Sequence, residues 1–234
     1  MTAPPTPGPA NRSTPAHAAL RAEICRVGKS LFDRGYVHAS AGNISVRLPD
    51  AAGFLITPTD ACLGTLQAER LAWVALDGTQ HAGAPASKTL ALHRQIYAAD
   101  PQAQCVIHSH STHLVALTLA GVWQQGAVLP PITPYFVMKV GRVPLVPYHR
   151  PGDAAVGVLV AQAIHASQAR GTALRAVLHD RLGPNVWHSN LAAALATLEE
   201  LEETARLWLM CNPRPAPLTE AQIDELRHRF GAHW

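Results

Sequence analysis

Apolar residues along this chain are spaced in two ways, one typical of helices and one typical of short strands. From Ala18 to Asp33 they recur every three or four positions, and Gly35 is placed to end the helix that this spacing predicts. Elsewhere, short apolar runs are bounded by Gly, Pro and Asp, which predicts strands. These strands are expected at 44–48, 54–56, 72–76, 143–146 and 173–178.

Further helices are predicted between and after these strands, and the sequence shows no internal repeat. The helix over 87–97 has Ser87 as its expected N-cap. The others are expected at 112–119, 153–166, 190–210 and 220–230. Strands and helices that alternate in this way favour an α/β protein. We interpret the Glu-Glu-Leu-Glu-Glu block at 199–203 as a solvated helix face.

The two parts of the chain differ in composition. Residues 1–17 are rich in Pro, Ala and Thr and bury too little surface to offset the entropy cost of ordering, which predicts a disordered tail. The remainder, 18–234, is expected to form one domain, because a chain with 48% hydrophobic residues can build a full core.

Charge and hydropathy exclude several classes of partner. The net charge of +3 arises from 19 basic and 16 acidic residues that are scattered along the chain, so we do not expect nucleic acid to be a partner. No apolar stretch approaches the ~20 residues of a membrane span, and the N-terminus lacks the pattern of a signal peptide. The four cysteines form no Cys-x-x-Cys pair. We therefore expect a cytoplasmic protein with reduced thiols and no membrane partner.

The motif His108-Ser109-His110 is the main candidate for chemistry. It closes the apolar run 105–107 and is followed at once by Ser111-Thr112, a helix-start signal. Residues two apart in a strand face the same side, so both imidazoles are expected to point into one space. Zinc binds imidazole nitrogen readily, and a catalytic zinc site has three protein ligands with one position open. The motif therefore predicts two of three metal ligands.

Four segments around this motif occur in an order that resembles a known family. They are SAGNISVRL (40–48), ITPTDACLG (56–64), SKTLALHRQIY (87–97) and CVIHSHSTHLVAL (105–117). Together they resemble the class II aldolase/adducin N-terminal family over about residues 18–210. Three more segments are similar to the branch described as 3-oxo-tetronate 4-phosphate decarboxylases: ITPYFVMKVGRVPLVPY (132–148), RPGD (150–153) and LEELEETARL (198–207).

This resemblance implies a fold and a class of activity. The fold is a three-layer α/β/α sandwich around a largely antiparallel, mixed sheet, assembled as a homotetramer with active sites between neighbouring subunits. Members bind one divalent metal ion per subunit, here expected to be zinc, with manganese or cobalt as alternatives. They act on small sugar phosphates through an enediolate, so the expected ligand is a small phosphorylated sugar acid.

The resemblance also assigns residues. It implies that His108 and His110 are metal ligands. Three loops are implied to hold the substrate phosphate, through Gly42 and Asn43, Thr59 and Asp60, and Ser87 and Lys88. Gly42 lets the backbone approach an anion closely, and Lys88 adds a positive charge. Asp60 stands where the family usually has glycine, and its carboxylate repels a phosphate unless Lys88 intervenes or the side chain points away.

Two positions depart from the family pattern. Thr89 stands where aldolases carry a glutamate, and Leu182 stands where the family has its third metal histidine. Leucine cannot coordinate a metal, so we expect Asp180 to substitute, because in an extended strand it shares a face with position 182. His179 would then face the opposite way unless a bulge intervenes. His93 and His113 are two further imidazoles, which we interpret as packed or surface histidines.

These departures bear on the reaction. Retro-aldol cleavage must remove a hydroxyl proton and needs a positioned base, whereas a β-keto acid loses CO2 without one, so Thr89 favours a decarboxylase. Tyr135 is the expected acid that protonates carbon, and Lys139 is a weaker alternative. The leading hypothesis is a 3-oxo-tetronate 4-phosphate decarboxylase that forms dihydroxyacetone phosphate and CO2. A class II sugar-phosphate aldolase or epimerase and a non-catalytic, adducin-like scaffold are the alternatives.

Overall fold

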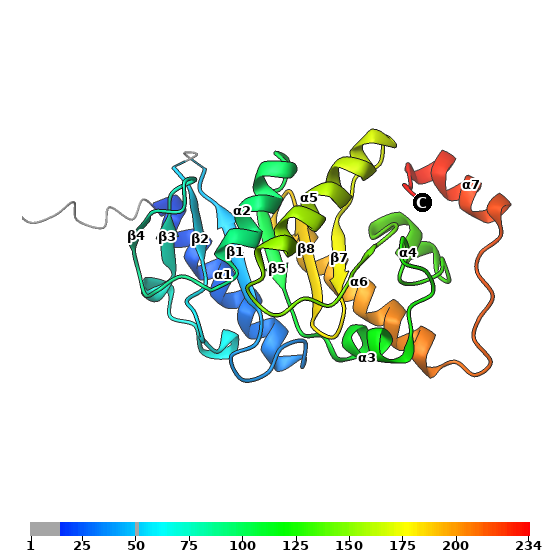
Figure 1. Cartoon of the computed structure of the whole chain (residues 1–234), viewed down its shortest axis with the longest axis horizontal. Coiled ribbons are helices and arrows are strands. Elements are labelled where there is room, and N and C mark those ends of the chain that lie inside the picture. Colours follow the sequence, from blue (N-terminus) through cyan, green and yellow to red (C-terminus); the bar gives the residue numbers. More distant parts are fainter. Residues whose placement is uncertain (1–14, 50–51) are drawn as a thin grey trace, which may run out of the picture.

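A mixed β-sheet forms the centre of the computed structural model, which describes residues 15–49 and 52–234 (Figure 1). Within these residues the sheet has eight strands in the order β4-β3-β2-β1-β5-β8-β7-β6. Neighbouring strands are antiparallel except β6 and β7, which are parallel. The strands are β1 (Asn43–Arg47), β2 (Phe54–Ile56), β3 (Ala72–Val74), β4 (Gln80–Ala82), β5 (Cys105–His108), β6 (Leu145–Val146), β7 (Ala176–His179) and β8 (Gly183–His188).

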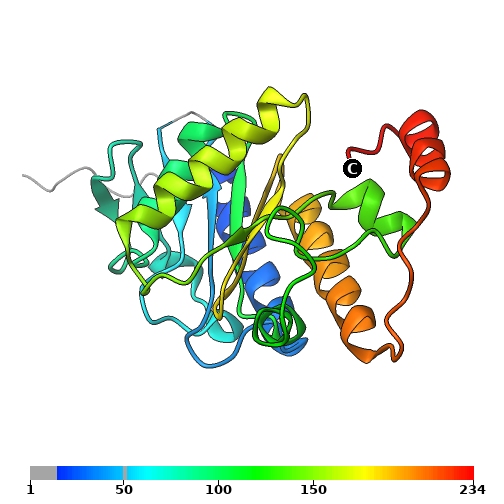
Figure 2. The same cartoon turned by 45° about the vertical axis from the view of Figure 1, so that its right-hand side comes forward.

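Helices cover both faces of this sheet, as the two views in Figure 1 and Figure 2 show. They are α1 (Pro15–Asp33), α2 (Leu90–Ala99), α3 (Thr112–Ala120), α4 (Pro134–Lys139), α5 (Ala154–Ala169), α6 (Leu191–Met210) and α7 (Glu220–Phe230). Helices α1, α3 and α6 share one hydrophobic core with the sheet, and α2 and α5 share a second core with its other face. The expected three-layer α/β/α sandwich with a mixed sheet is confirmed.

The central strand β5 determines on which side the His-x-His motif lies. Cys105 and Ile107 belong to the core with α1, α3 and α6, whereas Val106 belongs to the core with α2 and α5. Because side chains alternate along a strand, His108 faces the α2/α5 side. Asn43 of β1 and Asn185 of β8 are its partners in the neighbouring strands. A row of three polar side chains therefore crosses the middle of the sheet on this face.

Most predicted elements are confirmed, and two boundaries are corrected. Helix α1 begins at Pro15, so the last three residues of the predicted 1–17 tail are helical, while 1–14 lie outside the described residues. Ser87 is not the N-cap of α2, because that helix begins at Leu90 with Thr89 at the cap position. Ser87 lies in the preceding turn, and its Oγ is 3.0 Å from the Oγ1 of Thr89. Among the described helices, none is long and apolar enough to span a membrane.

The sequence analysis did not predict the strands β4 and β8 or the helix α4. Strand β8 begins with Gly183-Pro184 and carries Asn185, residue types that favour turns, yet it pairs with both β5 and β7 and is almost fully buried. Strand β4 is short and polar, and α4 has six residues with Pro134 in its first turn. Tertiary pairing, which local patterns do not reveal, stabilises the two strands.

The acidic block of α6 is not wholly solvated, which corrects the interpretation of 199–203 as a solvated face. Glu202 is only 4% exposed. Its carboxylate accepts hydrogen bonds from the backbone N–H groups of His113 and Leu114, at 2.9 and 3.1 Å, and lies 2.8 Å from the Nδ1 of His113. These N–H groups belong to the first turn of α3 and have no partner within that helix. Glu202 therefore ties α6 to the beginning of α3.

We expect Glu202→Ala to lower the free energy of unfolding by about 2–3 kcal/mol, because two helix N–H groups lose a charged acceptor. Glu203→Ala is the matched control, since Glu203 makes only an exposed ion pair with Arg206 and should cost less than about 1 kcal/mol. Urea unfolding of both variants measures the difference. Equal losses would contradict the role assigned to Glu202.

Candidate active site

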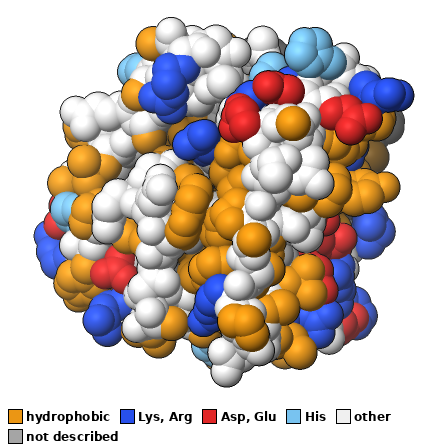
Figure 3. All heavy atoms as spheres, turned by 90° about the vertical axis from the view of Figure 1, so that its right-hand side faces the viewer, with side chains coloured by type: hydrophobic (Ala, Val, Ile, Leu, Met, Phe, Trp, Pro, Cys, Tyr) orange, Lys and Arg blue, Asp and Glu red, His pale blue; other side chains and the backbone are white. Residues whose placement is uncertain are grey.

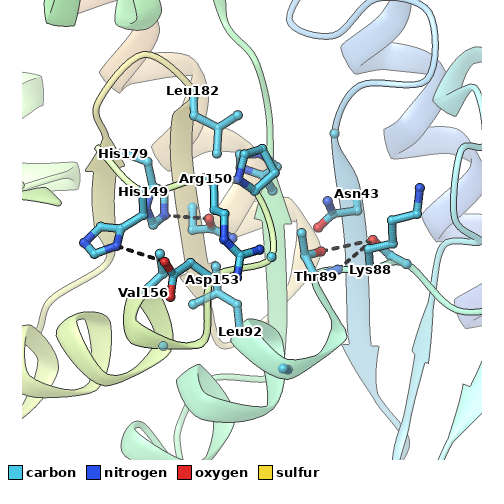
Figure 4. Close-up of a pocket in the computed structure, with 18 of the residues that line it drawn as sticks. Asn43, Lys88, Thr89, Leu92, His149, Arg150, Asp153, Val156, His179 and Leu182 are labelled. Atoms are coloured by element: carbon cyan, nitrogen blue, oxygen red, sulfur yellow. Dashed lines mark hydrogen bonds and ion pairs between the residues drawn. The ribbon is translucent and has the colours of Figure 1, made fainter. Parts of the chain in front are cut away.

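A cavity of about 430 Å³ lies on the α2/α5 side of the sheet, at the ends of the central strands (Figure 4). Its walls come from the loops before β1, after β2 and before α2, from the His-x-His motif, and from the segments before α5 and after β7. It brings together most of the predicted site residues. Those that line it are Gly42, Asn43, Thr59, Asp60, Ser87, Lys88, Thr89, His108, His110, Asp180 and also Leu182.

The two histidines of the motif converge within this cavity. Their Nε2 atoms are 3.1 Å apart, and His108 is only 4% exposed. The Nδ1 of His108 lies 2.9 Å from the carbonyl oxygen of Pro184. A carbonyl can only accept, so Nδ1 carries the proton and Nε2 of the neutral ring presents its lone pair. Two nitrogen ligands of one tetrahedral zinc ion, each at about 2.0–2.1 Å, are about 3.3–3.4 Å apart, close to the separation found here.

Both rings are held in the neutral form that a metal requires. Burial lowers the pKa of His108 well below its usual value, and the nearby His110 and His179 lower it further. Burial, with a contribution from His38, also lowers the pKa of His110. Neutral imidazoles bind a metal without first releasing a proton. The pair therefore fits a divalent ion, with a carbonyl orienting one ring as is usual for ligating histidines.

No third metal-binding side chain is placed beside the two histidines in the described part of the chain. Among the described residues, no group of three or more His, Cys, Asp or Glu side chains is placed to hold a metal ion together. Asp180 and Leu182 both line the cavity, and the Asp180 carboxylate lies 3.9 Å from the Nε of Arg181. Asp180 thus lies at the cavity wall, and its role as a ligand stays a prediction.

The orientation predicted for His179 is wrong. We expected it to face away from the site, but it lines the cavity, is 5% exposed, and has its ring centre 6.3 Å from that of His108. The prediction assumed an extended strand through position 182, whereas β7 ends at His179 and Arg181 has a positive φ of 62°. Burial lowers the pKa of His179 to about 4, so its ring is neutral.

Asn185 of β8 lies between His108 of β5 and His179 of β7, because β8 is the strand between β5 and β7 in the sheet. Its Oδ1 is 2.9 Å from the Nε2 of His179, which donates this hydrogen bond. The Nδ2 of Asn185 is buried and has no partner among the described residues. Sequence analysis missed Asn185, because it sits in a segment that has the composition of a turn.

Backbone geometry supports the loops expected to hold an anion. Gly42 has a φ of +82°, and a Cβ there would lie 2.6 Å from Val37 Cγ1 and 2.9 Å from the His108 carbonyl oxygen. Only glycine allows this close approach next to the histidine pair. Asp60 also has a positive φ, 54°, and its carboxylate lies 3.2 Å from the Nζ of Lys88. The sequence analysis required either that Lys88 offset the charge of the Asp60 carboxylate or that this side chain point away. The structure shows the first of these.

A buried chain of hydrogen bonds orients Asn43. Its Oδ1 lies 2.6 Å from the Nε2 of His93, whose Nδ1 lies 2.7 Å from the Oγ of Ser45, and that Oγ lies 2.7 Å from the Tyr97 hydroxyl. The amide oxygen can only accept, so His93 donates from Nε2 and accepts at Nδ1 from Ser45, which in turn accepts from Tyr97. The direction of every bond is thereby determined, and the Asn43 NH2 group is available as a donor to a ligand. The interpretation of His93 as a packed histidine is confirmed.

The structure does not bring Tyr135 and Lys139 to the cavity of their own chain, which corrects the expectation of an acid there. Both lie on α4, and Tyr135 is 62% exposed. In Figure 1, α4 lies next to α7 at one end of the molecule. His113 likewise lies outside the cavity and is bonded to Glu202.

The segment RPGD (150–153), which the sequence analysis quoted without a role, and the preceding His149, which it did not quote, supply further cavity residues. His149, Arg150 and Asp153 line the wall formed by the segment before α5 (Figure 4). Asp153 is the N-cap of α5, and its carboxylate accepts from the N–H of Ala155 at 3.0 Å. The Nδ1 of His149 lies 3.5 Å from the other Asp153 oxygen. The sequence signal that could have identified this wall is Arg150, a cationic residue shortly before the N-cap residue Asp153.

Comparison with known proteins agrees with this fold. Residues 22–209 match the model of the Class II Aldolase and Adducin N-terminal domain, and the chain belongs to this family. It is 56% identical over 220 residues to the 3-oxo-tetronate 4-phosphate decarboxylase of Cupriavidus necator, covering 92% of this chain and 97% of that protein. It is 41% identical over 210 residues to the protein of that name from Escherichia coli, covering 89% and 95%.

Solved structures give the same result. The crystal structure of YgbL from Escherichia coli superposes with a TM-score of 0.82 at 40% identity, covering 90% of this chain and 99% of that one. The L-fuculose-1-phosphate aldolase of Thermus thermophilus superposes with a TM-score of 0.69 at 28% identity, covering 82% and 93%.

The buried, neutral His93 predicts a pH-dependent stability. Burial lowers its pKa to about 3, whereas an unfolded histidine titrates near 6.5, so only the unfolded state takes up this proton as the pH falls from 6.5. His93 thus contributes stability that is fully present above pH 6.5 and is lost towards pH 3.

We therefore expect His93→Gln to reduce the loss of unfolding free energy below pH 6.5 by up to about 1.4 kcal/mol per pH unit. Urea unfolding between pH 6.5 and 5 measures this slope. Tyr97→Phe is the control, because it cuts the same hydrogen-bond chain without removing a histidine and should keep the wild-type slope. Identical slopes in His93→Gln and wild type would show that His93 is not buried in its neutral form.

Proposed function

We propose that this protein is a divalent-metal-dependent lyase that decarboxylates 3-oxo-tetronate 4-phosphate to dihydroxyacetone phosphate and CO2. The observation that carries the proposal is the pair of neutral imidazoles, His108 and His110, whose Nε2 atoms converge in a cavity bordered by anion-binding loops. Relatives named 3-oxo-tetronate 4-phosphate decarboxylase match nearly the whole chain, which supports this substrate over other sugar phosphates.

His108 and His110 would hold the metal ion, zinc in our proposal, with manganese or cobalt as alternatives. When bound, the ion supplies Lewis-acid stabilisation of the negative charge left on the substrate oxygen as CO2 departs. We propose Asp180 as the third ligand, because it lines the same cavity as the histidine pair and its half-buried carboxylate makes a long, 3.9 Å contact with the exposed Arg181. His179 is the less suitable candidate, since its Nε2 is engaged by Asn185.

The phosphate would lie against the loops that carry Gly42, Asn43, Thr59, Ser87 and Lys88. The Asn43 NH2 group is a donor whose orientation is determined by His93. Lys88 contributes charge, although Asp60 offsets part of it. These side chains bind the phosphate and leave the sugar-acid part of the substrate beside the histidines.

The proton chemistry is consistent with Thr89. Its hydroxyl is hydrogen-bonded to Ser87 and is not a general base, and CO2 loss from a β-keto acid requires none. Carbon must afterwards be protonated, and we propose Tyr135 for this step, with Lys139 as the weaker alternative. In a homotetramer, which we propose, Tyr135 would enter the cavity of a neighbouring copy.

The surface around Tyr135 supports such an assembly. The end of the molecule that carries α4 and α7 exposes much hydrophobic surface (Figure 3). Tyr135, Met210 and Phe230, from α4, α6 and α7, are each at least 60% exposed. Large apolar side chains grouped at one end of a chain are typical of a subunit interface.

The metal site can be tested without turnover. Purified protein is expected to contain about one divalent ion per chain by elemental analysis, and His108→Ala and Asp180→Ala should each lose most of it. His113→Ala is the matched control, because that imidazole lies outside the cavity and the variant should keep its metal. Full metal content in His108→Ala would refute the site, and absence of metal from the wild-type protein under replete conditions would favour a scaffold function.

The reaction is tested by CO2 release from 3-oxo-tetronate 4-phosphate. We expect metal-dependent CO2 formation together with stoichiometric dihydroxyacetone phosphate, and no cleavage of fuculose 1-phosphate. Aldehyde release without CO2 would instead identify an aldolase.

Lys88→Ala is expected to raise the KM for the phosphorylated substrate about tenfold, the equivalent of ~1.4 kcal/mol for one charged contact at an exposed site, with unchanged metal content. Asp60→Asn removes the carboxylate that competes for Lys88 and should lower the KM. Steady-state kinetics of both variants measure these opposite effects. An unchanged KM in Lys88→Ala would show that Lys88 does not contact the phosphate.

A further inference from the structure

The cavity carries positive charge at two separate places. Lys88 lies on one side and Arg150 on the other, and the two side chains come from distant segments of the chain (Figure 4). Lys88 is engaged by Asp60 at 3.2 Å. The guanidinium of Arg150 makes no hydrogen bond or ion pair with any residue in 15–49 or 52–234, although it lines the cavity.

Asp153, which lines the same wall of the cavity, does not neutralise Arg150. Asp153 is bound to the N–H of Ala155 and lies near His149, and the hydrogen bond from Ala155 is the main reason that its pKa is lowered. Arg150 itself contributes only weakly to that lowering. Its five N–H donors are therefore available to another anion.

The surroundings of Arg150 also favour negative charge. Helix α5 has 16 residues, and its first turn lines the cavity through Ala154, Val156 and Gly157. The N-terminus of a helix carries partial positive charge. Gly157 packs so tightly on α2 that a Cβ would lie 2.9 Å from the Gln95 side chain, which holds the start of α5 against the cavity wall.

We propose that Arg150, supported by the first turn of α5, binds the carboxylate of the substrate. This inference rests on the proposed function, since a sugar-acid phosphate has two anionic groups at opposite ends of a short carbon chain. The phosphate occupies the Lys88 side and the carboxylate the Arg150 side. Arg150 then selects sugar acids over uncharged sugars, because a planar guanidinium matches a carboxylate with two parallel hydrogen bonds.

This assignment has a kinetic consequence. The bond between C2 and the carboxylate carbon breaks, its electron pair stays on the substrate, and the carboxylate leaves as neutral CO2. The contact with Arg150 is therefore strongest in the bound substrate and weakens as the transition state forms. Loss of such a contact raises KM and does not lower kcat, because the contact stabilises the bound substrate more than the transition state.

Binding of two unreactive probes tests the inference. Erythronate 4-phosphate carries both anionic groups, and erythritol 4-phosphate has the same carbon chain with an alcohol in place of the carboxylate. By titration calorimetry with the metal-loaded protein, wild type should bind the acid more tightly. Arg150→Gln should weaken binding of the acid at least fivefold and leave binding of the alcohol within twofold.

Controls separate this outcome from others. Arg170→Gln, at the opposite end of α5, should leave both affinities unchanged, and Arg150→Lys should recover part of the preference for the acid. With the reactive substrate, Arg150→Gln should raise KM at least fivefold without lowering kcat. Equal weakening of both probes, or an unchanged preference for the acid, would overturn the inference.

Failure of the proposed function would look different. If the acid preference depends on Arg150 but no CO2 is released, the carboxylate site stands and the decarboxylase assignment falls. If CO2 is released and Arg150→Gln keeps the acid preference, the decarboxylase stands and another group binds the carboxylate.

Discussion

The hydrogen bond from the Nδ1 of His108 to the carbonyl oxygen of Pro184 is the interaction on which the site depends. It orients the ring, determines its tautomer and leaves Nε2 facing His110. It exists because β5 and β8 pair in a register that places His108 opposite Asn185. Gly183 permits this arrangement, since a Cβ there would lie 2.2 Å from the carbonyl oxygen of Ser109. The metal chemistry that we propose is thus a consequence of strand pairing at the centre of the sheet.

The same face of the sheet buries an unusual number of polar groups, and their hydrogen bonds compensate for the cost of burial. Asn43, Ser45, His93 and Tyr97 form one chain in which the acceptor-only amide oxygen determines every donor. An unpaired polar group in such an environment costs about 1–3 kcal/mol, so a chain with complete pairing also selects one conformation. The orientation of Asn43 at the cavity is therefore determined by the buried side chains of Ser45, His93 and Tyr97.

The departures from the family pattern affect the site and not the fold. Thr89 and Leu182 line the cavity, whereas the two cores that hold the helices to the sheet consist of other residues. A fold of this kind can therefore keep its architecture while individual cavity residues change the chemistry that it supports. In the reaction that we propose, CO2 loss needs no base at position 89, and Asp180 is the oxygen ligand that we propose in place of Leu182.

Hydrophobic patterning was sufficient to predict the helices α1, α3, α5, α6 and α7, because their apolar residues recur at helical spacing. It was also sufficient for the strands β1, β2 and β5, because each lies in a short apolar run. The His-x-His motif likewise predicted that two imidazoles lie together, because residues two apart in an extended segment point to the same side. The pairing of β8, the inward turn of His179, the burial of Glu202 and the position of Arg150 opposite Lys88 depended on tertiary structure. Each arises from contacts between segments distant in sequence, and no local pattern encodes which distant group a side chain meets. The sequence alone therefore determined the elements and the central chemistry, whereas packing decided which residues surround it.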